Sequence, residues 1–218
     1  DEWRQRGCVG WDWDSVVPYF KKSEDQERGP SQYHGVGGPL RVSDVPFRME
    51  LAERWIAAGI EAGLPANDDF NGGTQDGVGL FQSTTNRRRR WSAADAFLHP
   101  ARNRPNLKIE TNAYATKILI ENGRATGIAY TQNGIARIAH ARGEVILCGG
   151  VFNTPQLLQL SGLGPAELLR NLGISVVRDM KAVGADLQDH FSARIHFRCT
   201  QPITFNDVVN SFWRKMAA

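Results

Sequence analysis

Cysteine is scarce in this chain, and the three cysteines, Cys8, Cys148 and Cys199, lie far apart in the sequence. An odd and unclustered set argues against a scaffold held by disulfide bonds. It also argues against a structural zinc site, which needs closely spaced ligands. The same scarcity favours a reducing compartment such as the cytoplasm.

Long apolar runs and a large excess of one charge are also missing. No segment approaches the roughly 18 to 20 apolar residues of a membrane-spanning helix, and no apolar signal segment follows Asp1. The net charge of +3 for 218 residues is too small to indicate an anionic partner by itself. Because 41% of the residues are hydrophobic, the chain can bury a core, and its length suits one or two domains.

One stretch in the carboxyl-terminal half combines an apolar strand, a glycine turn and a helix that starts at a proline. Residues 144–148 have the apolar character of a strand covered on both faces, and Gly149 and Gly150 allow a sharp turn or a close ligand. Thr154 can cap a helix whose first residue is Pro155. The free N–H groups at such a helix start suit a pyrophosphate or a flavin edge, and a plain strand, turn and helix of an α/β core shows the same pattern.

The clearest β pattern lies just before this stretch, where four runs rich in apolar and β-branched residues follow one another. Asn122-Gly123 and Asn133-Gly134 separate the last three runs. Asn-Gly is the preferred pair for a two-residue hairpin turn, because both turn positions need a positive φ. We therefore predict a three-stranded meander that leads into the covered strand at 144–148. The four predicted strands are residues 107–111, 114–121, 124–132 and 135–141.

Two packing helices are expected nearer the amino terminus. Asp14 or Ser15 can cap a helix that runs to about Ser23. A second helix spans residues 47–62, with apolar residues on one face, and Gly63 ends it. Together with the strands, these helices give a mixed α/β chain.

A run of four arginines, residues 87–90, precedes Trp91. Basic residues beside an aromatic ring are typical of nucleic-acid binding, but the cluster is isolated and the overall charge is modest. We therefore interpret it as a solvated basic loop and expect no nucleic-acid partner. Ser92 and Asp95 have the spacing of a helix-capping pair, a structural role.

No histidine has a clear catalytic or metal-binding partner nearby in the sequence. Asp189 and His190 are adjacent, and adjacent residues on a strand point to opposite faces, so we interpret His190 as a packing or hydrogen-bonding residue. Asp68, Asp69 and Asp76 resemble a calcium loop in composition only, because the alternating ligands and the terminal Glu are missing. The histidines without a partner close in the sequence are His34, His99, His140 and His196.

Several blocks of sequence together are similar to one known family. They are GW at 10–11 with VPYFKKSE at 17–24, RWSAA at 90–94 with FL at 97–98, RPNL at 104–107, the 150–164 stretch and GADLQDH at 184–190. In this order they resemble the glucose-methanol-choline (GMC) oxidoreductases, whose second signature is similar to Gly150, Thr154-Pro155 and Ser161-Gly162-Leu163-Gly164. Val151 departs from the alanine that is usual in the family. The resemblance spans nearly the whole chain but only the middle of a family member.

The resemblance implies FAD as the cofactor and a particular division of the chain. Residues 103–190 correspond to part of an FAD-binding, Rossmann-like domain that contains the meander, and 1–102 and 191–218 correspond to parts of a substrate-binding domain. Backbone atoms of Ala115 are expected near the adenine. Gly149, Gly150 and Thr154 are expected beside the cofactor.

The resemblance also implies the oxidation of an alcohol to a carbonyl compound by hydride transfer to flavin, with a carboxyl-terminal His removing the hydroxyl proton. The family's Gly-x-Gly-x-x-Gly turn does not open this chain, and no residue matches the catalytic His. We therefore assign no catalytic residue and expect a central fragment that is inactive alone and binds FAD weakly or not at all. The alternative is an inert folded module, or one in which residues 87–90 hold an anion.

One position bears on the substrate, a small-molecule alcohol. The choline-acting branch of the family carries a Glu shortly after its Asp-His pair, and this carboxylate helps to hold the quaternary ammonium group. Ser192 occupies the corresponding place here and has no charge. We therefore expect an uncharged alcohol rather than choline.

Overall fold

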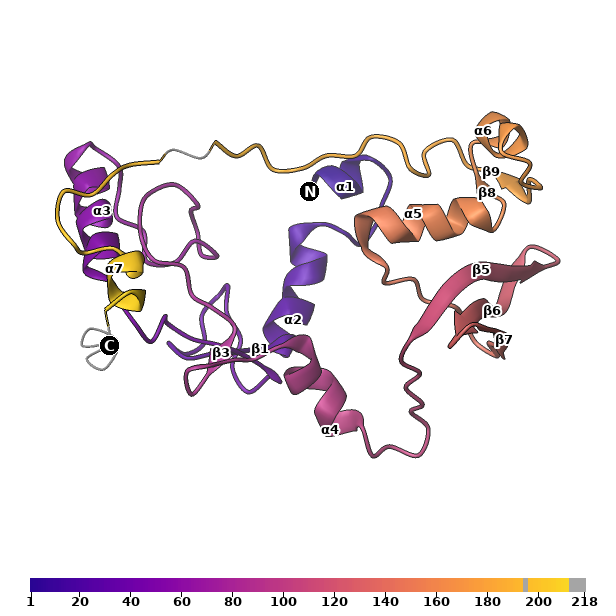
Figure 1. Cartoon of the computed structure of the whole chain (residues 1–218), viewed down its shortest axis with the longest axis horizontal. Coiled ribbons are helices and arrows are strands. Elements are labelled where there is room, and N and C mark those ends of the chain that lie inside the picture. Colours follow the sequence, from indigo (N-terminus) through magenta and orange to yellow (C-terminus); the bar gives the residue numbers. More distant parts are fainter. Residues whose placement is uncertain (194–195, 212–218) are drawn as a thin grey trace. The chain divides into compact units, whose positions relative to one another are not determined.

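The computed structural model of the chain describes residues 1–193 and 196–211 (Figure 1). These residues form two compact units, which are considered separately. Unit 1 contains Asp1–Leu107 and the described residues of His196–Ala218, and unit 2 contains the described residues of Lys108–Ile195. None of the described helices is long and apolar enough to cross a membrane.

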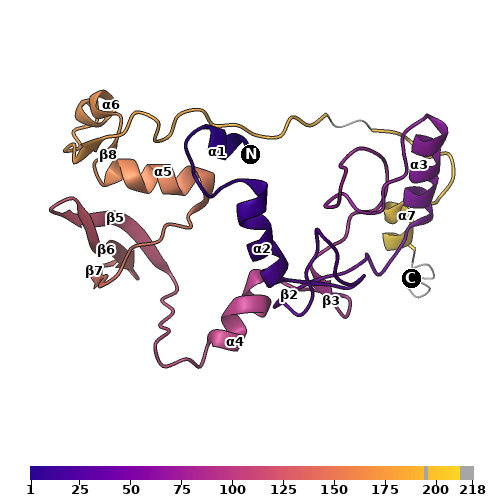
Figure 2. The same cartoon turned by 180° about the vertical axis from the view of Figure 1, so that it is seen from behind.

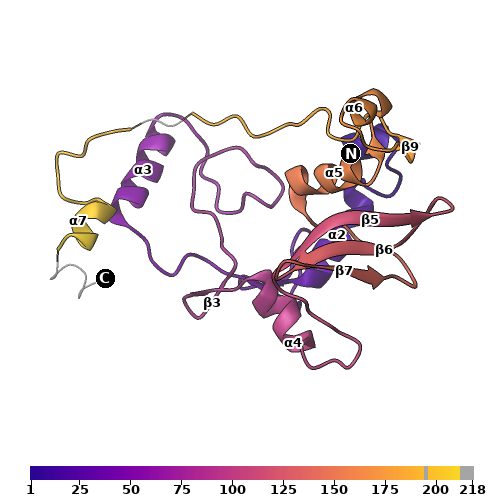
Figure 3. The same cartoon turned by 45° about the vertical axis from the view of Figure 1, so that its right-hand side comes forward.

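Unit 2 is built on the predicted meander. β5 (Ala113–Glu121), β6 (Arg124–Gln132) and β7 (Ile135–His140) pair antiparallel in that order (Figure 3). The φ angles of the two Asn-Gly turns lie between +50° and +77°, as a two-residue turn of this kind requires. The prediction of three strands and two tight turns is therefore confirmed.

Two other predicted strands are absent from the described structure. Residues 107–111 and 144–148 belong to no strand, and Ile146 in the second segment is 75% exposed. A strand needs a neighbouring backbone to which its N–H and C=O groups bond, and apolar character alone does not supply one. The prediction of a doubly covered strand at 144–148 is wrong for this structure, because none of the described strands pairs with that segment.

The helix that follows, α5 (Gly150–Leu160), begins earlier than predicted. Its N-cap is Gly149, no side chain caps it, and Pro155 lies inside the helix rather than at its first position. The φ of +80° at Gly150 lets the chain turn directly into the helix, so that Thr154 is not needed as a cap. α5 packs beside β5, as all views show (Figure 2).

The rest of unit 2 forms a small layer after α5. β8 (Leu163–Gly164) pairs parallel with β9 (Arg178–Asp179), and α6 (Ala166–Asn171) connects them. Leu169 in α6 is fully buried. His190 lies beyond this layer, outside any described helix or strand, and is exposed, so the packing role among its two predicted roles is wrong here. Its backbone N–H donates a hydrogen bond to Asp189 Oδ1 at 2.8 Å.

Unit 1 begins with helices whose caps differ slightly from the predicted ones. α2 (Trp13–Ser23) is capped by Asp12, whose Oδ1 accepts hydrogen bonds from the backbone N–H and the hydroxyl of Ser15. The expected caps, Asp14 and Ser15, lie inside the helix. α3 (Glu50–Glu61) ends just before Gly63, which has a φ of +95°, as predicted.

The other elements of unit 1 are short. Ser92 and Asp95 form the predicted capping pair: Asp95 Oδ2 accepts from the Ser92 N–H at 3.0 Å, and Ser92 Oγ accepts from the Asp95 N–H at 3.2 Å. Trp55 of α3 contacts Phe197, with ring centroids 5.7 Å apart. The remaining elements are α1 (Glu2–Gln5), the parallel pair β1 (Glu24–Gln26) and β2 (Leu40–Val42), the hairpin of β3 (Thr85–Asn86) and β4 (Arg89–Arg90), the π-helical turn η1 (Ala94–Leu98), α4 (His99–Ala101) and α7 (Phe205–Val209).

Candidate functional site at the amino end of helix α5

A cavity of about 970 Å³ in unit 2 opens at the amino end of α5. One wall is the end of the extended 144–148 segment together with α5, and the facing wall is the loop at 184–188. The residues that line it are Leu147, Cys148, Gly150, Val151, Phe152, Thr154, Pro155, Gln156, Gln159, Gly184, Ala185, Asp186, Leu187 and Gln188. The cavity therefore joins two of the sequence blocks that resemble one family, although they lie far apart in sequence.

Gln159 fixes the distance between these two walls. Its Nε2 donates a hydrogen bond to the backbone oxygen of Val183 at 3.0 Å. Gly184 follows with a φ of +82°, and a Cβ atom there would lie 2.6 Å from Gln159 Nε2. The loop thus passes close to α5, and a side chain at Gly184 would both strain the backbone and push Gln159 away from Val183.

The two glycines at the helix start differ in the space around them. A Cβ atom on Gly149 would lie 3.2 Å from the Cβ of Asn153, so the backbone of α5 already fills that side. A Cβ atom on Gly150 would meet no atom of the chain within 4 Å. The backbone of Gly150 is therefore open to a bound group, and the N–H groups of the first helical turn carry partial positive charge there.

The four predicted cofactor residues are not all brought together. Gly150 and Thr154 line the cavity, and Gly149 immediately precedes it as the N-cap of α5. Ala115 lies in β5, half-buried, where it pairs with Tyr130 of β6, and it is not among the lining residues. The structure thus groups three of the four residues and places Ala115 on the neighbouring sheet.

The ionisable groups that line this cavity are few. Asp186, which has a φ of +53°, and Cys148 are both exposed, and no His, Lys or Arg is among the lining residues. The wall therefore offers backbone N–H groups, the Thr154 hydroxyl, glutamine amides and apolar surface, with Asp186 as the one carboxylate among the described lining residues. Such a wall can hold and orient a ligand, but it offers no histidine to remove a proton.

The arginine run in unit 1 forms the tip of the hairpin of β3 and β4. Arg87 and Arg88 are the two turn residues, with φ angles of +48° and +65°. All four arginines of 87–90 are exposed, and none makes an ion pair with another described residue. A positive φ costs a non-glycine residue about 1 to 2 kcal/mol, so this turn is strained as well as highly charged.

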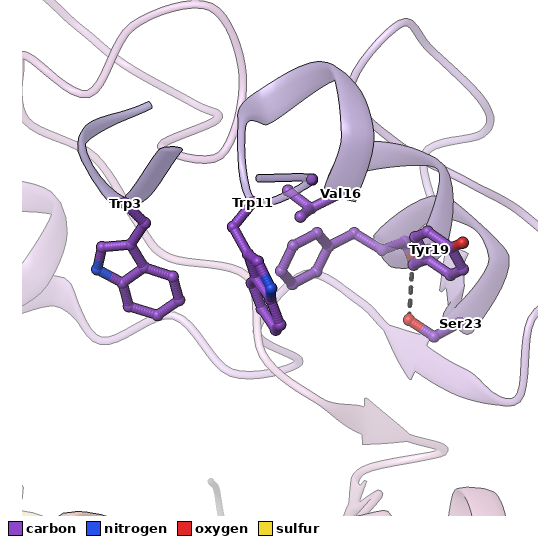
Figure 4. Close-up of a pocket in the computed structure, with 7 residues that line it drawn as sticks. Trp3, Trp11, Val16, Tyr19 and Ser23 are labelled. Carbon is purple, nitrogen blue, oxygen red and sulfur yellow. Dashed lines mark hydrogen bonds between the residues drawn. The ribbon is translucent and has the colours of Figure 1, made fainter. Parts of the chain in front are cut away.

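Aromatic side chains form a separate pocket of about 590 Å³ in unit 1 (Figure 4). Trp3 and Trp11 lie next to each other, with ring centroids 5.6 Å apart, and Val16 and Tyr19 of α2 line the same hollow. Ser23 Oγ donates to the Phe20 backbone oxygen at 2.8 Å. None of the lining residues is charged, so this pocket offers apolar contact and no acid–base chemistry.

The sequence analysis missed a buried histidine in unit 1. His34 is 7% exposed, and its two ring nitrogens face two carboxylates. Nδ1 lies 2.9 Å from Glu24 Oε1, and Nε2 lies 3.0 Å from Asp69 Oδ2. Glu24 is ten residues away in the sequence and Asp69 is thirty-five away, so no local pattern pointed to this group.

The charges around His34 favour its protonated form. Burial is the largest single influence and opposes the charge, but the hydrogen bonds and charges of Glu24 and Asp69 together outweigh it and raise the pKa of His34 above its ordinary 6.5. Among the described residues no group of three or more His, Cys, Asp or Glu is placed to hold a metal ion. The cluster is therefore an ion-paired histidine.

Comparison with known proteins gives concordant results. The family described as GMC oxidoreductase matches residues 1–192. Human mitochondrial choline dehydrogenase is 44% identical over 206 residues, which are 94% of this chain and 35% of that protein. The oxygen-dependent choline dehydrogenase of Sinorhizobium fredii is 42% identical over 217 residues, which are all of this chain and 39% of that protein. The chain thus spans little more than a third of these relatives.

Solved structures agree with the sequence comparison. An FAD-dependent oxidoreductase from Chaetomium thermophilum superposes with a TM-score of 0.75 at 32% identity, covering 82% of this chain and 34% of that one. Pyridoxine 4-oxidase from Mesorbium loti gives a TM-score of 0.73 at 33% identity, covering 78% of this chain and 34% of that one. The architecture of the described chain is therefore shared with larger oxidoreductases.

Proposed function

Because the chain belongs to the GMC oxidoreductase family, we propose that it is the part of an FAD-dependent enzyme that holds the cofactor at the amino end of α5 while an alcohol is oxidised to a carbonyl compound. The fold is mixed α/β and corresponds to part of the FAD-binding, Rossmann-like region of that family. The observation that carries the proposal is the open backbone of Gly150 at the start of α5, facing a cavity large enough for part of a dinucleotide.

The residues around this cavity fit part of the cofactor. Gly149 and Gly150 present backbone N–H groups at the positive end of α5, and Thr154 adds a hydroxyl. Ala115, in the strand beside α5, is proposed to contact the adenine through its backbone. When bound, FAD supplies the hydride acceptor, and these residues bind and orient it.

No catalytic residue is assigned to this chain. The proposed proton acceptor of the reaction is a His that the family carries outside the blocks matched here, and the cavity at α5 is lined by no histidine. We expect the 218-residue chain by itself to oxidise no alcohol and to bind FAD weakly or not at all. Turnover of any alcohol by the chain alone would contradict this assignment.

We propose that residues 103–190 belong to the FAD-binding domain and that 1–102 and 191–218 belong to a substrate-binding domain. The compactness of unit 2, Lys108–Ile195, supports the first assignment. The break between the two units falls a few residues from each proposed boundary.

For the substrate we propose a small uncharged alcohol. Two of the similar proteins are choline dehydrogenases, and choline carries a permanent positive charge. Ser192 is exposed here. By the family resemblance it stands at the position of the carboxylate that the choline-acting branch uses for that charge. A panel of alcohols tested on the full-length enzyme decides the point. A specificity constant for choline at least equal to that for neutral alcohols of similar size would overturn the preference.

The experiment that tests the cofactor site compares two glycine variants of the full-length enzyme. Gly150 and Gly134 have nearly equal φ angles, +80° and +77°, and a Cβ atom on either meets nothing within 4 Å. Gly150→Leu and Gly134→Leu therefore impose similar backbone strain. We expect only Gly150→Leu to lower the flavin content per protein, and added FAD to restore part of it. Equal flavin content in both variants would place the cofactor elsewhere.

A second candidate function is anion binding by the arginine tip at 87–90. The observation in its favour is that four exposed arginines have no ion pair with another described residue. Titration with inorganic pyrophosphate tests it. Binding that is lost in the double variant Arg87→Asn/Arg88→Gly would support an anion site, and binding that is unchanged or absent would leave the tip as a solvated loop.

A further inference from the structure

We infer that His34 is a pH-dependent link between the loop at 67–78 and strand β1. The protonated ring holds the loop to β1, and the loop is released when the ring loses a proton. This inference concerns unit 1 alone and does not depend on the proposed cofactor site. It rests on the position of the ring, on the two carboxylates that flank it, and on how each carboxylate is anchored.

The ring has a separate carboxylate at each nitrogen. Nδ1 lies 2.9 Å from Glu24 Oε1, and Nε2 lies 3.0 Å from Asp69 Oδ2. Ionised carboxylates only accept hydrogen bonds, so both contacts are satisfied only when both ring nitrogens carry protons. A neutral ring has one N–H, and its other nitrogen would then face the lone pairs of an oxygen. The geometry therefore fits the imidazolium.

Glu24 is anchored to the β1 side of this cluster. Its Oε2 accepts a hydrogen bond at 2.9 Å from the N–H of Gly35, the residue that follows His34. Gly35 itself passes so close to α2 that a Cβ atom there would lie within bonding distance of the Lys21 backbone. Gly35 is thus held against both the Glu24 carboxylate and α2, which keeps His34 beside Glu24.

Asp69 belongs to a loop that is folded upon itself. The N–H of Asn67 donates to the Val78 backbone oxygen at 3.0 Å and closes the loop, while Asn67 Nδ2 donates to the Thr74 and Asp76 backbone oxygens, each at 3.0 Å. The Asp69 N–H donates to Asn67 Oδ1 at 2.9 Å. These bonds therefore hold the backbone of the 67–78 loop together, with Asp69 fixed within it.

Few other polar contacts tie this loop to the rest of unit 1. Arg28 Nη1 donates to the Asp68 backbone oxygen at 2.6 Å, and Arg28 also pairs with Asp44. A Cβ atom on Gly73 would lie 3.0 Å from the Tyr33 hydroxyl, so the loop also packs closely against Tyr33. The Arg28 contact ends on a backbone oxygen, which has no proton to lose, so the His34 contact is the tie that responds to pH.

Few charged groups lie around His34, so the groups that set its pKa can be named. β1 contributes Glu24, and the loop contributes Asp69. On α2, the Lys21 ammonium group donates to the Ser31 backbone oxygen at 2.6 Å. Gln26 of β1 adds an uncharged amide at 3.5 Å from Nδ1. The two carboxylates therefore dominate, and they raise the pKa of His34 despite the burial that opposes its charge.

The direction of the pH response follows from the raised pKa. A group whose pKa is higher in the folded than in the unfolded protein contributes its full stabilisation below the unfolded pKa, which is 6.5 for histidine. That contribution declines as the pH rises above 6.5 and is lost once the pH passes the folded pKa. The loop is thus held to β1 below pH 6.5 and released once the pH exceeds the folded pKa of His34.

Hydrogen exchange of the full-length protein between about pH 5.5 and about pH 9 tests this link. The exchange rates are converted to protection factors, so that base catalysis of exchange cancels. The amide of Asn71 is the reporter, because it donates at 3.1 Å to Asp69 Oδ1 of the same carboxylate that faces His34, so a carboxylate that turns away from the ring leaves this amide without its acceptor. We expect its protection to fall as the pH rises through the folded pKa of His34. Protection that does not change with pH in the wild-type protein would overturn the inference.

Three variants distinguish the His34 link from a general loosening of the 67–78 loop. His34→Gln should give low protection without a pH transition. Asp69→Asn keeps an acceptor but removes a charge, so the transition should move down by about one pH unit or more. His99→Gln is the control, because His99 is exposed and pairs only with Asp95 among the described residues. If His34→Gln does not fold, an Asp69→Asn transition at the wild-type pH would still overturn the proposal.

Discussion

The Ser161 hydroxyl is hydrogen-bonded to the Ile118 backbone in the interior of unit 2. Its Oγ accepts a hydrogen bond from the Ile118 backbone N–H at 2.8 Å and donates one to the Leu157 backbone oxygen at 2.6 Å. Ser161 is 1% exposed and Ile118 4% exposed, so no solvent competes for these bonds. One hydroxyl thus joins the end of α5 to β5, and it holds the helix whose other end forms the candidate cofactor site.

Replacing this hydroxyl is expected to destabilise unit 2. Ser161→Ala leaves the Ile118 N–H buried without its acceptor, which costs about 1 to 3 kcal/mol. Ser175→Ala is the matched control, because Ser175 is exposed and its side chain makes no hydrogen bond with another described residue. Denaturant unfolding of both variants measures the difference. Equal unfolding free energies would show that the Ser161 bond contributes nothing.

A glycine pair separates steric crowding from backbone strain. Gly162 and Gly173 both have positive φ angles, +88° and +71°. A Cβ atom on Gly162 would lie 2.5 Å from the Ser175 backbone oxygen, whereas one on Gly173 meets nothing within 4 Å. Gly173→Ala should cost about 1 to 2 kcal/mol from its φ alone, and Gly162→Ala should cost clearly more. Thermal unfolding compares the two, and similar losses would mean that the loop moves away from Gly162 freely.

The parts of unit 2 that were predicted correctly depend on local chemistry. Asn122-Gly123 and Asn133-Gly134 each fix a turn by their own backbone preferences, so the meander follows from the sequence. The strand expected at 144–148 depends on a distant partner, which an apolar run does not specify. The start of α5 was misplaced because Pro155 at the first helical position is only a preference, and the φ of Gly150 started the helix sooner.

The candidate sites also divide into residues that the sequence identifies and contacts that only the tertiary structure shows. Gly150 and Thr154 were identified by resemblance to a signature, and the structure places both at one cavity. The loop at 184–188 forms the other wall, and no local pattern shows that it meets α5. His34 was dismissed because its partners were sought close in the sequence, whereas Asp69 approaches through a folded loop. Contacts between distant segments need the tertiary structure.

The cap of α2 gives a prediction with a defined pH dependence. Hydrogen bonds from the Ser15 hydroxyl and N–H lower the pKa of Asp12 below its ordinary 3.8. A carboxyl group with a lowered pKa stabilises the fold above its unfolded pKa, and the contribution is lost as the pH falls through the folded value. Asp12→Ala should therefore destabilise α2 at neutral pH, and the difference from wild type should shrink below pH 3.8.

Asp14→Ala is the control for this cap. Asp14 is exposed in the first turn of α2 and caps nothing, so its loss should have a smaller effect. Asp12→Asn retains an oxygen acceptor and should recover most of the stability at neutral pH. Circular dichroism during thermal unfolding measures all three variants. A larger effect of Asp14→Ala than of Asp12→Ala would identify Asp14 as the cap after all.

The strained arginine turn gives the last prediction. Arg87 and Arg88 occupy turn positions that Asn and Gly occupy in the two hairpins of unit 2. The double variant Arg87→Asn/Arg88→Gly should therefore raise the unfolding free energy by about 1 kcal/mol or more, because Gly adopts a positive φ without the penalty of a side chain. Arg87→Lys/Arg88→Lys keeps both the charge and the strain, so it should leave stability unchanged.

The same two variants distinguish a solvated loop from an anion site. A solvated loop predicts that the Asn-Gly variant of the full-length enzyme keeps its flavin content and gains stability. An anion site predicts that this variant loses pyrophosphate binding while the double lysine variant retains much of it, since lysine carries the same charge. Denaturant unfolding and calorimetric titration with pyrophosphate give the two readouts. Stability that falls in the Asn-Gly variant would show that the arginine side chains hold the turn through contacts that outweigh the strain.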